Sequence, residues 1–382
     1  MIDYKQVKYS AYVLDEALLR KNLEIIRHVQ AEASVDIILA FKGFSMWSAF
    51  PMVREYAKGA TASSLFEARL CFEEMKTKAH AYSAAYNPHE FDEMMKYSSH
   101  ITFNSVNQYL TYKDKVNDFN KSKKKISCGI RVNPEYSEVE TDLYNPCAPG
   151  SRLGATIENF PNGLPEGVEG LHFHALCESS SYELEKVLAS FESIFGDFIP
   201  KIKWLNVGGG HLMTRKDYNI PHLIKVLKTF KAKHPHLKII MEPGSAFAWQ
   251  TGVLVANVLD MVENKGVKTL MLDVSFTAHM PDCLEMPYRP KITGASDPVE
   301  GRPTYRIGGT SCLSGDYMEN YSFEKEVQVG DQIIFEDMMH YTIVKTTMFN
   351  GVRHPDICIW RENNTLDIVK SFDYSDYRNR MS

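Results

Sequence analysis

The fold of this 382-residue chain can be worked out from one stretch near its start, VDIILAFKGF (Val35–Phe44). The run is mostly aliphatic and is bounded by a polar turn and a glycine, which is the pattern of a buried parallel strand. Lys42 stands at its C-terminal end. In alternating strand and helix folds that end faces the ligand, so an amine beside apolar neighbours is a candidate Schiff-base lysine. A lysine that extends its ammonium into solvent is the more common alternative for this stretch alone.

The same unit of a short strand and an amphipathic helix recurs after Lys42, and each strand ends in a small or polar residue. Helical patterns such as 65–75 and 184–195 separate the strands. Eight such units over about 240 residues predict a closed (β/α)8 TIM-like barrel with its active site at the C-terminal strand ends. The seven further strand ends are Ala60–Ser63, Ala81–Ser83, Ile101–Asn104, Cys128–Arg131, Leu171–His174, Leu205–Gly208 and Ile239–Glu242.

The sequence pattern changes at about Ser245, after which short β-rich runs are separated by turns that contain Gly, Pro and Asp. These runs predict an antiparallel β-sheet domain. The early segment Ala11–Leu14 is expected to join this sheet, because an isolated strand would leave its backbone groups unpaired. The expected domains are therefore an N-terminal segment (1–14), a barrel (15–244) and a sheet domain (245–382).

Composition narrows the class of protein. The length exceeds that of a usual single core, and 44% hydrophobic with 24% charged residues describes an ordinary globular chain. A net charge of −5 without a long basic run argues against nucleic acid or an anionic membrane as the main partner. No window approaches the ~20 apolar residues of a membrane span, and no signal-peptide core begins the chain, so we expect a cytoplasmic protein. The seven cysteines are scattered singly, which favours free thiols over a metal site or a disulfide framework.

Two motifs at the last predicted strand ends can bind a charged cofactor. Gly208–Gly210 follows the seventh strand, where barrels commonly bind phosphate through backbone N–H groups, although tight turns use the same residues. Glu242 ends the eighth strand, and its carboxylate can hold a proton on a heteroaromatic nitrogen. Gly244 and Ser245 can add an N–H group and a hydroxyl to the phosphate site. The alternative is a glutamate before an ordinary Pro-Gly turn.

His174 ends the sixth predicted strand, two residues after His172, so strand alternation puts both rings on one side. A zinc site would need a third ligand at a recognisable spacing, and no such spacing supports it. We therefore expect no metal and assign the His174 ring to stacking on a flat cofactor. A satisfied buried histidine is the more common case for any single His.

The order of these motifs resembles the alanine-racemase-like, pyridoxal-phosphate-dependent decarboxylases of fold type III, over nearly the whole chain. The motifs are Phe41–Gly43, the run ending at His174, Gly208–Gly210, Glu242–Gly244, Gly308–Cys312, and Tyr341-Thr342 ahead of Phe349–Gly351. The local sequence at residues 40–42, 174–178 and 275–290 is most similar to that of the carboxynorspermidine (carboxyspermidine) decarboxylases. The resemblance implies an alanine racemase-like fold and a pyridoxal 5'-phosphate cofactor.

The resemblance also implies residue roles. Lys42 would carry the cofactor as a Schiff base, His174 would stack on its ring, and Glu242 would pair with the ring nitrogen. Cys312 would protonate the product carbanion from the partner subunit of a head-to-tail homodimer. The residues implied to contact or support the cofactor elsewhere are Gly208, Gly209, Gly210, Gly244, Tyr341 and Arg131.

Three departures from ornithine decarboxylase-like relatives are visible. Their aspartate before the second strand is replaced by Gly59 ahead of Ala60–Ser63, and Ser245 replaces a phosphate-binding arginine. The acid that directly follows their cysteine is replaced by Leu313, so the nearest acid is Asp316.

A substrate with distant amines needs fixed anions near the active site, although each acid alone is more commonly a surface carboxylate. The expected substrate-binding residues are His279, Asp282, Glu285, Asp316 and Glu319. We therefore expect decarboxylation of carboxynorspermidine or carboxyspermidine to norspermidine or spermidine in polyamine biosynthesis. The alternatives are a diaminopimelate, ornithine or arginine decarboxylase, an amino-acid racemase of the same fold, and a non-catalytic cofactor-binding regulatory homologue.

Overall fold

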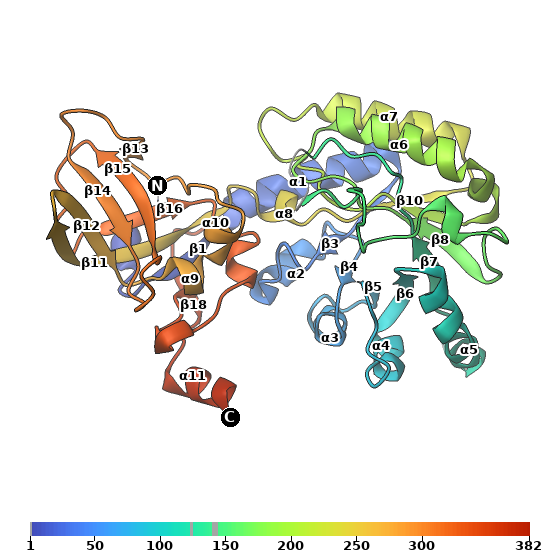
Figure 1. Ribbon diagram of the computed structural model, residues 1–382, viewed down its shortest axis with the longest axis horizontal. Helices are drawn as coiled ribbons and strands as arrows, with labels where there is room; N and C mark the ends of the chain where they lie inside the picture. Colours follow the sequence, from blue (N-terminus) through green and yellow to red (C-terminus); the bar gives the residue numbers. More distant parts are fainter. Residues whose placement is uncertain (1, 123–124, 140–143) are drawn as a thin grey trace. The chain divides into compact units, whose positions relative to one another are not determined.

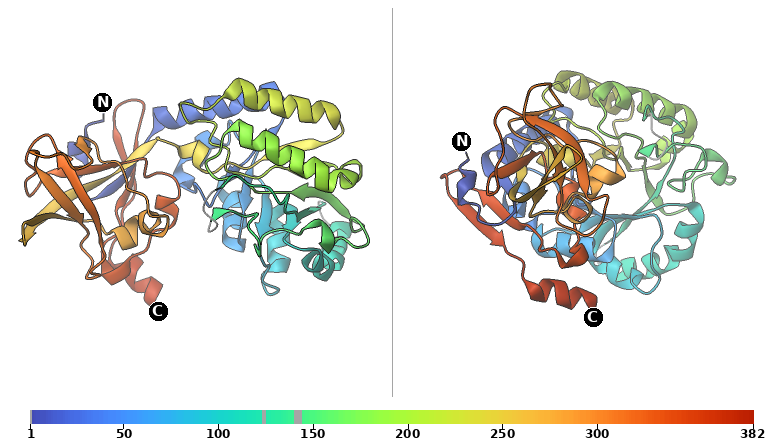
Figure 2. Two further views of the ribbon diagram at one scale, coloured as in Figure 1. Left: turned by 45° about the horizontal axis from the view of Figure 1, so that its top comes forward. Right: turned by 60° about the vertical axis from the view of Figure 1, so that its left-hand side comes forward.

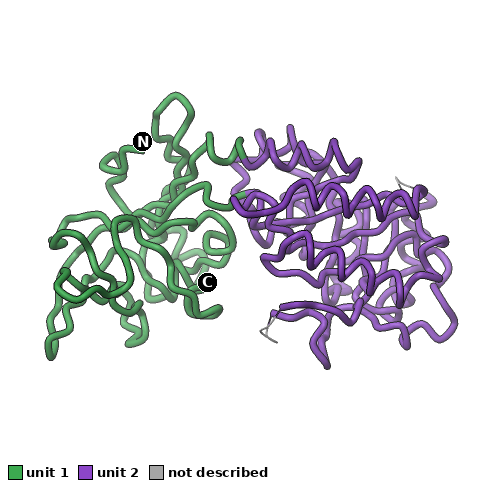
Figure 3. Tube along the Cα trace, turned by 90° about the horizontal axis from the view of Figure 1, so that it is seen from above, with its two compact units in different colours: residues 1–21, 248–382 green, residues 22–247 purple. Residues whose placement is uncertain are grey.

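The computed structural model describes residues 2–122, 125–139 and 144–382, and the chain divides into two compact units. Unit 1 comprises residues 1–21 and 248–382, and unit 2 comprises residues 22–247 (Figure 3). The boundaries expected from the sequence were Asp15 and Ser245. The division instead falls within helices α1 (Glu16–Ala33) and α8 (Ser245–Ala248). In the described ranges, no helix has both the length and the apolar character that crossing a membrane requires.

Unit 2 contains the predicted barrel of parallel strands. The first strand is split: β2 pairs with β10, and β3 pairs with β4, so the ring of neighbours closes on it. Ile38 N donates to Met241 O, and Leu39 N donates to Gly59 O, on the two sides of this strand. The TIM-like prediction is therefore confirmed. The barrel strands are β2 (Asp36–Ile37), β3 (Leu39–Ala40), β4 (Ala60–Ala62), β5 (Ala79–Ser83), β6 (Ser98–Phe103), β7 (Ser127–Arg131), β8 (Val168–His172), β9 (Trp204–Asn206) and β10 (Lys238–Met241).

Trp204 on β9 shows why two of these strands carry glycine. A Cβ atom at Gly129 or Gly170 would lie 2.3 or 2.1 Å from indole atoms of Trp204, so both positions must stay without a side chain. The indole Nε1 donates to Ser127 Oγ at 2.8 Å. The Trp204 ring therefore fills the space that Gly129 and Gly170 leave open in the barrel.

Helices connect most of the barrel strands in the alternating order predicted from the sequence (Figure 1), but the described residues between β7 and β8 form only a 3-10 turn, η4. Helix α3 begins after Ser64, whose hydroxyl accepts the Glu67 N–H, while Glu67 returns a carboxylate to the Ser63 N–H. This reciprocal capping satisfies donors that the first helical turn leaves free. Figure 2 gives two further views of the strands and helices. The helices are α2 (Phe50–Val53), α3 (Leu65–Glu74), α4 (Phe91–Tyr97), α5 (Val106–Ser122), α6 (Ser181–Phe195) and α7 (Ile220–Lys233), with 3-10 turns η2 (Trp47–Ala49), η4 (Ile157–Asn159) and η5 (Gly196–Lys201).

Unit 1 is built on a sheet in the order β13-β15-β14-β12-β11-β1-β17-β18, with β16 also paired to β11. β1 joins it, antiparallel to β11 and parallel to β17, and β12 and β14 are also parallel. The sheet is therefore mixed rather than purely antiparallel. These pairs join strands that are distant in the chain, so no hairpin turn forces them to run in opposite directions. The strands are β1 (Ala11–Asp15), β11 (Gly252–Asn264), β12 (Val267–Leu272), β13 (Ala295–Ser296), β14 (Thr304–Gly308), β15 (Tyr317–Phe323), β16 (Gln332–Glu336), β17 (Asp356–Trp360) and β18 (Leu366–Lys370).

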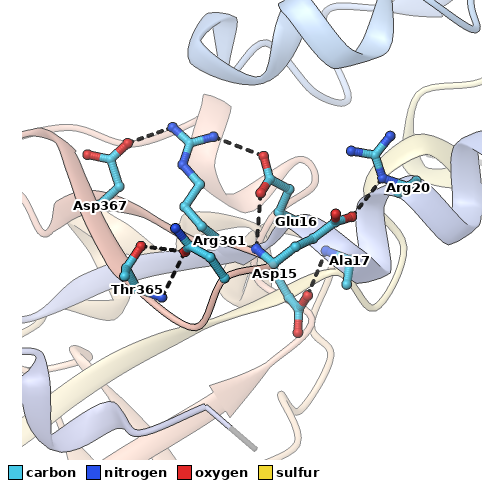
Figure 4. A network of polar contacts seen from close by, with 9 residues as sticks. Asp15, Glu16, Ala17, Arg20, Arg361, Thr365 and Asp367 are labelled. Carbon is cyan, nitrogen blue, oxygen red and sulfur yellow. Dashed lines mark hydrogen bonds and ion pairs between the residues drawn. The ribbon is translucent and has the colours of Figure 1, made fainter.

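A polar network fixes the start of α1 to the β17–β18 hairpin within unit 1 (Figure 4). Arg361 donates to Glu16 at 3.0 Å and to Asp367 at 2.5 Å, and Arg20 donates to Glu362 at 2.6 Å. These contacts explain why the first turns of α1 belong with the sheet. The remaining elements of unit 1 are α9 (Phe276–His279), α10 (Pro281–Glu285), α11 (Tyr374–Met381), η1 (Tyr4–Gln6), η6 (Thr342–Val344) and η7 (Phe349–Gly351).

Candidate active site

Lys42 lies two residues beyond the end of β3, in a tight turn. The N–H groups of Gly43 and Phe44 both donate to Ala40 O, at 3.0 and 3.3 Å. Solvent reaches the lysine side chain, yet the groups around it desolvate the amine and lower its pKa, while Glu242 opposes this shift. A lowered pKa leaves more of the amine unprotonated and therefore nucleophilic near neutral pH.

Glu242 directly follows β10 and is buried, with 7% of its surface exposed. Its Oε1 lies 3.0 Å from His172 Nε2, and its Oε2 accepts a hydrogen bond from Asn206 Nδ2 at 2.9 Å. Burial acts to raise the pKa of the Glu242 carboxyl, but His172, Asn206 and Lys42 outweigh it and lower the pKa to about 2. Glu242 is therefore a buried anion that can hold a proton on an adjacent heteroaromatic nitrogen.

Asn206 was not singled out in the sequence, and its position offers the signal that could have found it. It is a polar residue in the otherwise apolar β9 run, one strand from Glu242, and it is 4% exposed. Besides its bond to Glu242, its Oδ1 accepts the N–H of Gly208 at 2.9 Å. Asn206 thus joins the carboxylate to the glycine turn.

His174 lies two residues beyond β8, not at its end as the sequence indicated. The strand stops at His172, which pairs with Asn206 on β9. The N–H of Gly209 donates to His174 Nδ1 at 2.8 Å, so Nδ1 is the acceptor and a neutral ring carries its proton on Nε2. Burial lowers the pKa of His174 well below its usual value, and Lys42 and Arg131 add to this effect. The ring is thus an uncharged planar group beside Lys42.

The glycine run packs tightly against neighbouring backbone. A Cβ atom at Gly208, Gly209 or Gly210 would lie 2.4, 2.6 or 2.2 Å from a carbonyl oxygen. Gly208 and Gly210 also have positive φ, at 72° and 83°. Phosphate binding through the N–H of Gly208 or Gly209 would have to replace its bond to Asn206 or His174. The glycine run is therefore a tight turn, and its proposed role in phosphate binding stays a prediction.

Two further cofactor candidates lie close to this set. Arg131 at the end of β7 is buried, donates to His174 O at 3.2 Å, and lies over the Tyr82 ring at 4.9 Å. Gly244 precedes Ser245, the first residue of α8, and packs against Gly43. A Cβ atom on Gly43 would lie 2.7 Å from Gly244 Cα. The turns after the first and last barrel strands therefore touch beside Lys42.

Unit 1 contains the other expected site residues. Cys312 is exposed, and its N–H donates to Asn350 Oδ1 at 2.9 Å. Tyr341 precedes η6 with φ at 49°, an uncommon conformation for a residue with a side chain. Glu285 and Glu319 are largely exposed and form ion pairs with Lys345 and Arg306, at 2.6 and 3.4 Å.

The remaining three substrate-binding candidates are buried. His279 is 0% exposed, accepts the Ser275 N–H at 3.2 Å, and packs against the His354 ring, so it lies in the interior of unit 1 rather than at an opening. Asp282 is 4% exposed and its Oδ2 accepts hydrogen bonds from Tyr288 and Thr342, both at 2.8 Å. Asp316 is also 4% exposed, and its carboxylate accepts backbone N–H groups.

Comparison with known proteins identifies relatives over the full length. The family model described as "Pyridoxal-dependent decarboxylase, C-terminal sheet domain" matches residues 11–339. A carboxyaminopropylagmatine decarboxylase from Synechocystis sp. is 49% identical, covering 97% of this chain and 94% of the relative. A carboxynorspermidine/carboxyspermidine decarboxylase from Campylobacter jejuni is 41% identical, covering 98% of both chains. The crystal structure of carboxynorspermidine decarboxylase from C. jejuni, complexed with norspermidine, superposes with a TM-score of 0.89 at 40% identity, covering 98% of this chain and 100% of that chain.

The barrel carries an amine of lowered pKa, a buried carboxylate and an uncharged imidazole at or just beyond its C-terminal strand ends, and these groups suit a pyridoxal-phosphate-dependent enzyme. The chain belongs to the pyridoxal-dependent decarboxylases. Its cofactor is pyridoxal 5'-phosphate, and the residues fit that group. Lys42 offers an amine of lowered pKa, Glu242 a fixed negative charge and His174 a flat neutral ring.

Proposed function

We propose that this decarboxylase acts on carboxynorspermidine or carboxyspermidine, releasing CO2 and norspermidine or spermidine in polyamine biosynthesis. The observation that carries the proposal is the buried, ionised Glu242 beside Lys42 in a chain 41% identical to the C. jejuni relative. A second relative of that name, from Herminiimonas arsenicoxydans, is 32% identical over 97% of this chain.

The residues of the barrel support this chemistry. Pyridoxal phosphate, when bound, accepts the electron pair left by departing CO2. Lys42 would hold the cofactor through its amine, which its surroundings make less basic. Glu242 would keep a proton on the ring nitrogen, and the contacts of His172 and Asn206 fix the carboxylate for that task. His174 would lie against the ring, oriented by the Gly209 N–H.

Cys312 is proposed as the acid that gives a proton to the carbon atom from which CO2 has left, because a thiol can donate a proton near neutral pH and this one is exposed. It would enter the active site from the partner subunit of a homodimer, as the family resemblance implies. Tyr341 and Gly244 would contribute to phosphate binding. The cytoplasm is the proposed location, which the seven unpaired cysteines favour.

A second substrate is favoured by one observation, the 49% identity to a carboxyaminopropylagmatine decarboxylase. Such a substrate has the same amino-acid end, but its distal group is a guanidinium instead of an ammonium. A guanidinium is planar and binds carboxylates in a bidentate manner, whereas an ammonium acts as a point charge. The two candidates therefore differ only in the distal part of the binding site.

Other decarboxylase activities are less well supported. Relatives named diaminopimelate or ornithine decarboxylase are 25–26% identical over 39–66% of this chain. Cys312 and the second domain after Ser245 count against a non-catalytic cofactor carrier, and Lys42 and Glu242 count against a homologue that has lost the cofactor site. The decisive experiment measures CO2 release from carboxynorspermidine, carboxyspermidine, carboxyaminopropylagmatine, diaminopimelate, ornithine and arginine. We expect the highest kcat/KM with a carboxylated triamine. Preference for diaminopimelate would refute the proposal, and preference for carboxyaminopropylagmatine would select the second candidate.

A further inference from the structure

The Asp316 carboxylate connects a helix and a loop of unit 1. Its Oδ1 accepts the N–H groups of Phe276 and Thr277 at 2.7 and 3.3 Å, which are the free donors of the first turn of α9. Its Oδ2 accepts the N–H of Ser311 at 3.1 Å. One buried side chain thus holds the first turn of α9 against the loop that carries Cys312.

The backbone around Asp316 strengthens this connection. Asp316 O accepts the Gly309 N–H at 2.7 Å, and Thr310 N donates to Val274 O at 2.9 Å. Gly309 has no room for a side chain, because a Cβ atom there would lie 2.5 Å from both carboxylate oxygens. The segment is therefore closed around the carboxylate, leaving no space between Gly309 and Asp316.

Cys312 begins the exposed part of this loop. Residues 312–315 are exposed, whereas Asp316 is 4% exposed. The peptide N–H just before Cys312, that of Ser311, is bound by Asp316, and the N–H of Cys312 itself is bound by Asn350. The thiol is thus presented on an exposed loop whose two ends are fixed.

The sequence favoured Asp316 as an anion for the amines of the substrate. A substrate ammonium would have to compete with three backbone N–H donors for the two carboxylate oxygens of Asp316, which are away from solvent. We infer instead that Asp316 is a positioning residue, which holds the Cys312 loop in the conformation that delivers the proton. This inference rests on the proposed acid role of Cys312.

The test uses the loaded enzyme with two independent variants. Asp316→Asn replaces one acceptor oxygen with an NH2 group that faces N–H donors, and Gly309→Ala displaces the carboxylate without removing its charge. Both should lower kcat about tenfold and change KM less than about twofold, because orientation and not affinity is lost. Hydrogen exchange of the Ser311 and Cys312 amides should accelerate in both variants, while that of β17 stays unchanged. Asp331→Asn is the control, since Asp331 also accepts a backbone N–H, from Gln328 at 2.8 Å, but lies in a different turn.

A double-mutant cycle with Cys312→Ala separates the possible failures. If Asp316 acts through the thiol, Asp316→Asn should not lower kcat further once Cys312 is alanine. If Cys312→Ala alone keeps the wild-type rate, the acid role proposed for Cys312 is wrong. If Cys312→Ala is slow and adding Asp316→Asn to it lowers kcat again, the positioning role is wrong. The positioning role is also wrong if Asp316→Asn alone mainly raises KM. Should Asp316→Asn fail to fold, a wild-type kcat for Gly309→Ala overturns the inference.

Discussion

At the scale of single residues, Glu242 gains its character from its neighbours. His172 and Asn206 hold a carboxylate that burial alone would protonate more easily. Because the pKa of the folded state lies near 2 and the ordinary value is 4.5, the ionised group stabilises the fold above about pH 4.5. That stabilisation, up to about 3 kcal/mol, is lost as the pH falls from 4.5 towards 2.

Glu242→Gln should therefore be less stable than the wild type at neutral pH, with a difference that shrinks as the medium is acidified. Urea unfolding of the cofactor-free protein at several pH values, from about pH 6 to about pH 3, measures this difference. Glu319→Gln is the control, because its carboxylate is on the surface and 64% exposed. A difference that stays constant across this range would mean that Glu242 has no lowered pKa.

Lys42 offers a direct chemical test at the same scale. Reduction of the loaded protein with borohydride should fix the cofactor to the peptide that contains Lys42, detectable by mass spectrometry. The reason is that Lys42 follows β3 with its amine made less basic by its surroundings and next to Glu242. Lys42→Ala should give no labelled peptide and no decarboxylation, whereas Lys345→Ala, which removes a surface partner of Glu285, should be labelled normally. Labelling at another lysine would refute the assignment.

At the scale of elements, the turn after β3 and the turn after β10 touch through Gly43 and Gly244. Gly43→Ala would push a methyl group to 2.7 Å from Gly244 Cα and so move Lys42 relative to Glu242. We expect a loss of about 1–3 kcal/mol of stability from overpacking and at least about tenfold weaker cofactor binding. Urea unfolding and fluorescence titration with pyridoxal phosphate measure these two effects. Gly196→Ala is the control, because its added Cβ would meet no atom within 4 Å outside its own stretch of chain and its φ is −53°. Unaltered cofactor binding in Gly43→Ala would show that this contact does not position Lys42.

Elements also show what sequence reasoning can and cannot reach. The barrel was predictable because buried parallel strands appear as continuous apolar runs that end in small or polar residues, as at Ala40 and Asn206. Strands such as β18 were missed because exposed and half-buried positions give them no apolar run. The parallel pairing of β1 with β17 joins opposite ends of the chain, and no local pattern encodes it. For the same reason the sequence shows that Asn206 and Asp316 are polar residues, but it does not show which distant groups they bind.

At the scale of the whole molecule, the proposed homodimer makes a prediction that neither unit makes alone. Lys42 belongs to unit 2 and Cys312 to unit 1, and the proposal assigns them to one active site across two subunits. Lys42→Ala and Cys312→Ala homodimers should each be inactive or nearly so. Co-expressed with different tags and purified as the mixed dimer, they should contain one site with both residues intact and one lacking both. The mixed dimer should then regain about half of the wild-type kcat per dimer, and about a quarter in an unsorted equal mixture. Mixed dimers as inactive as their parents would place Lys42 and Cys312 of one active site in the same subunit.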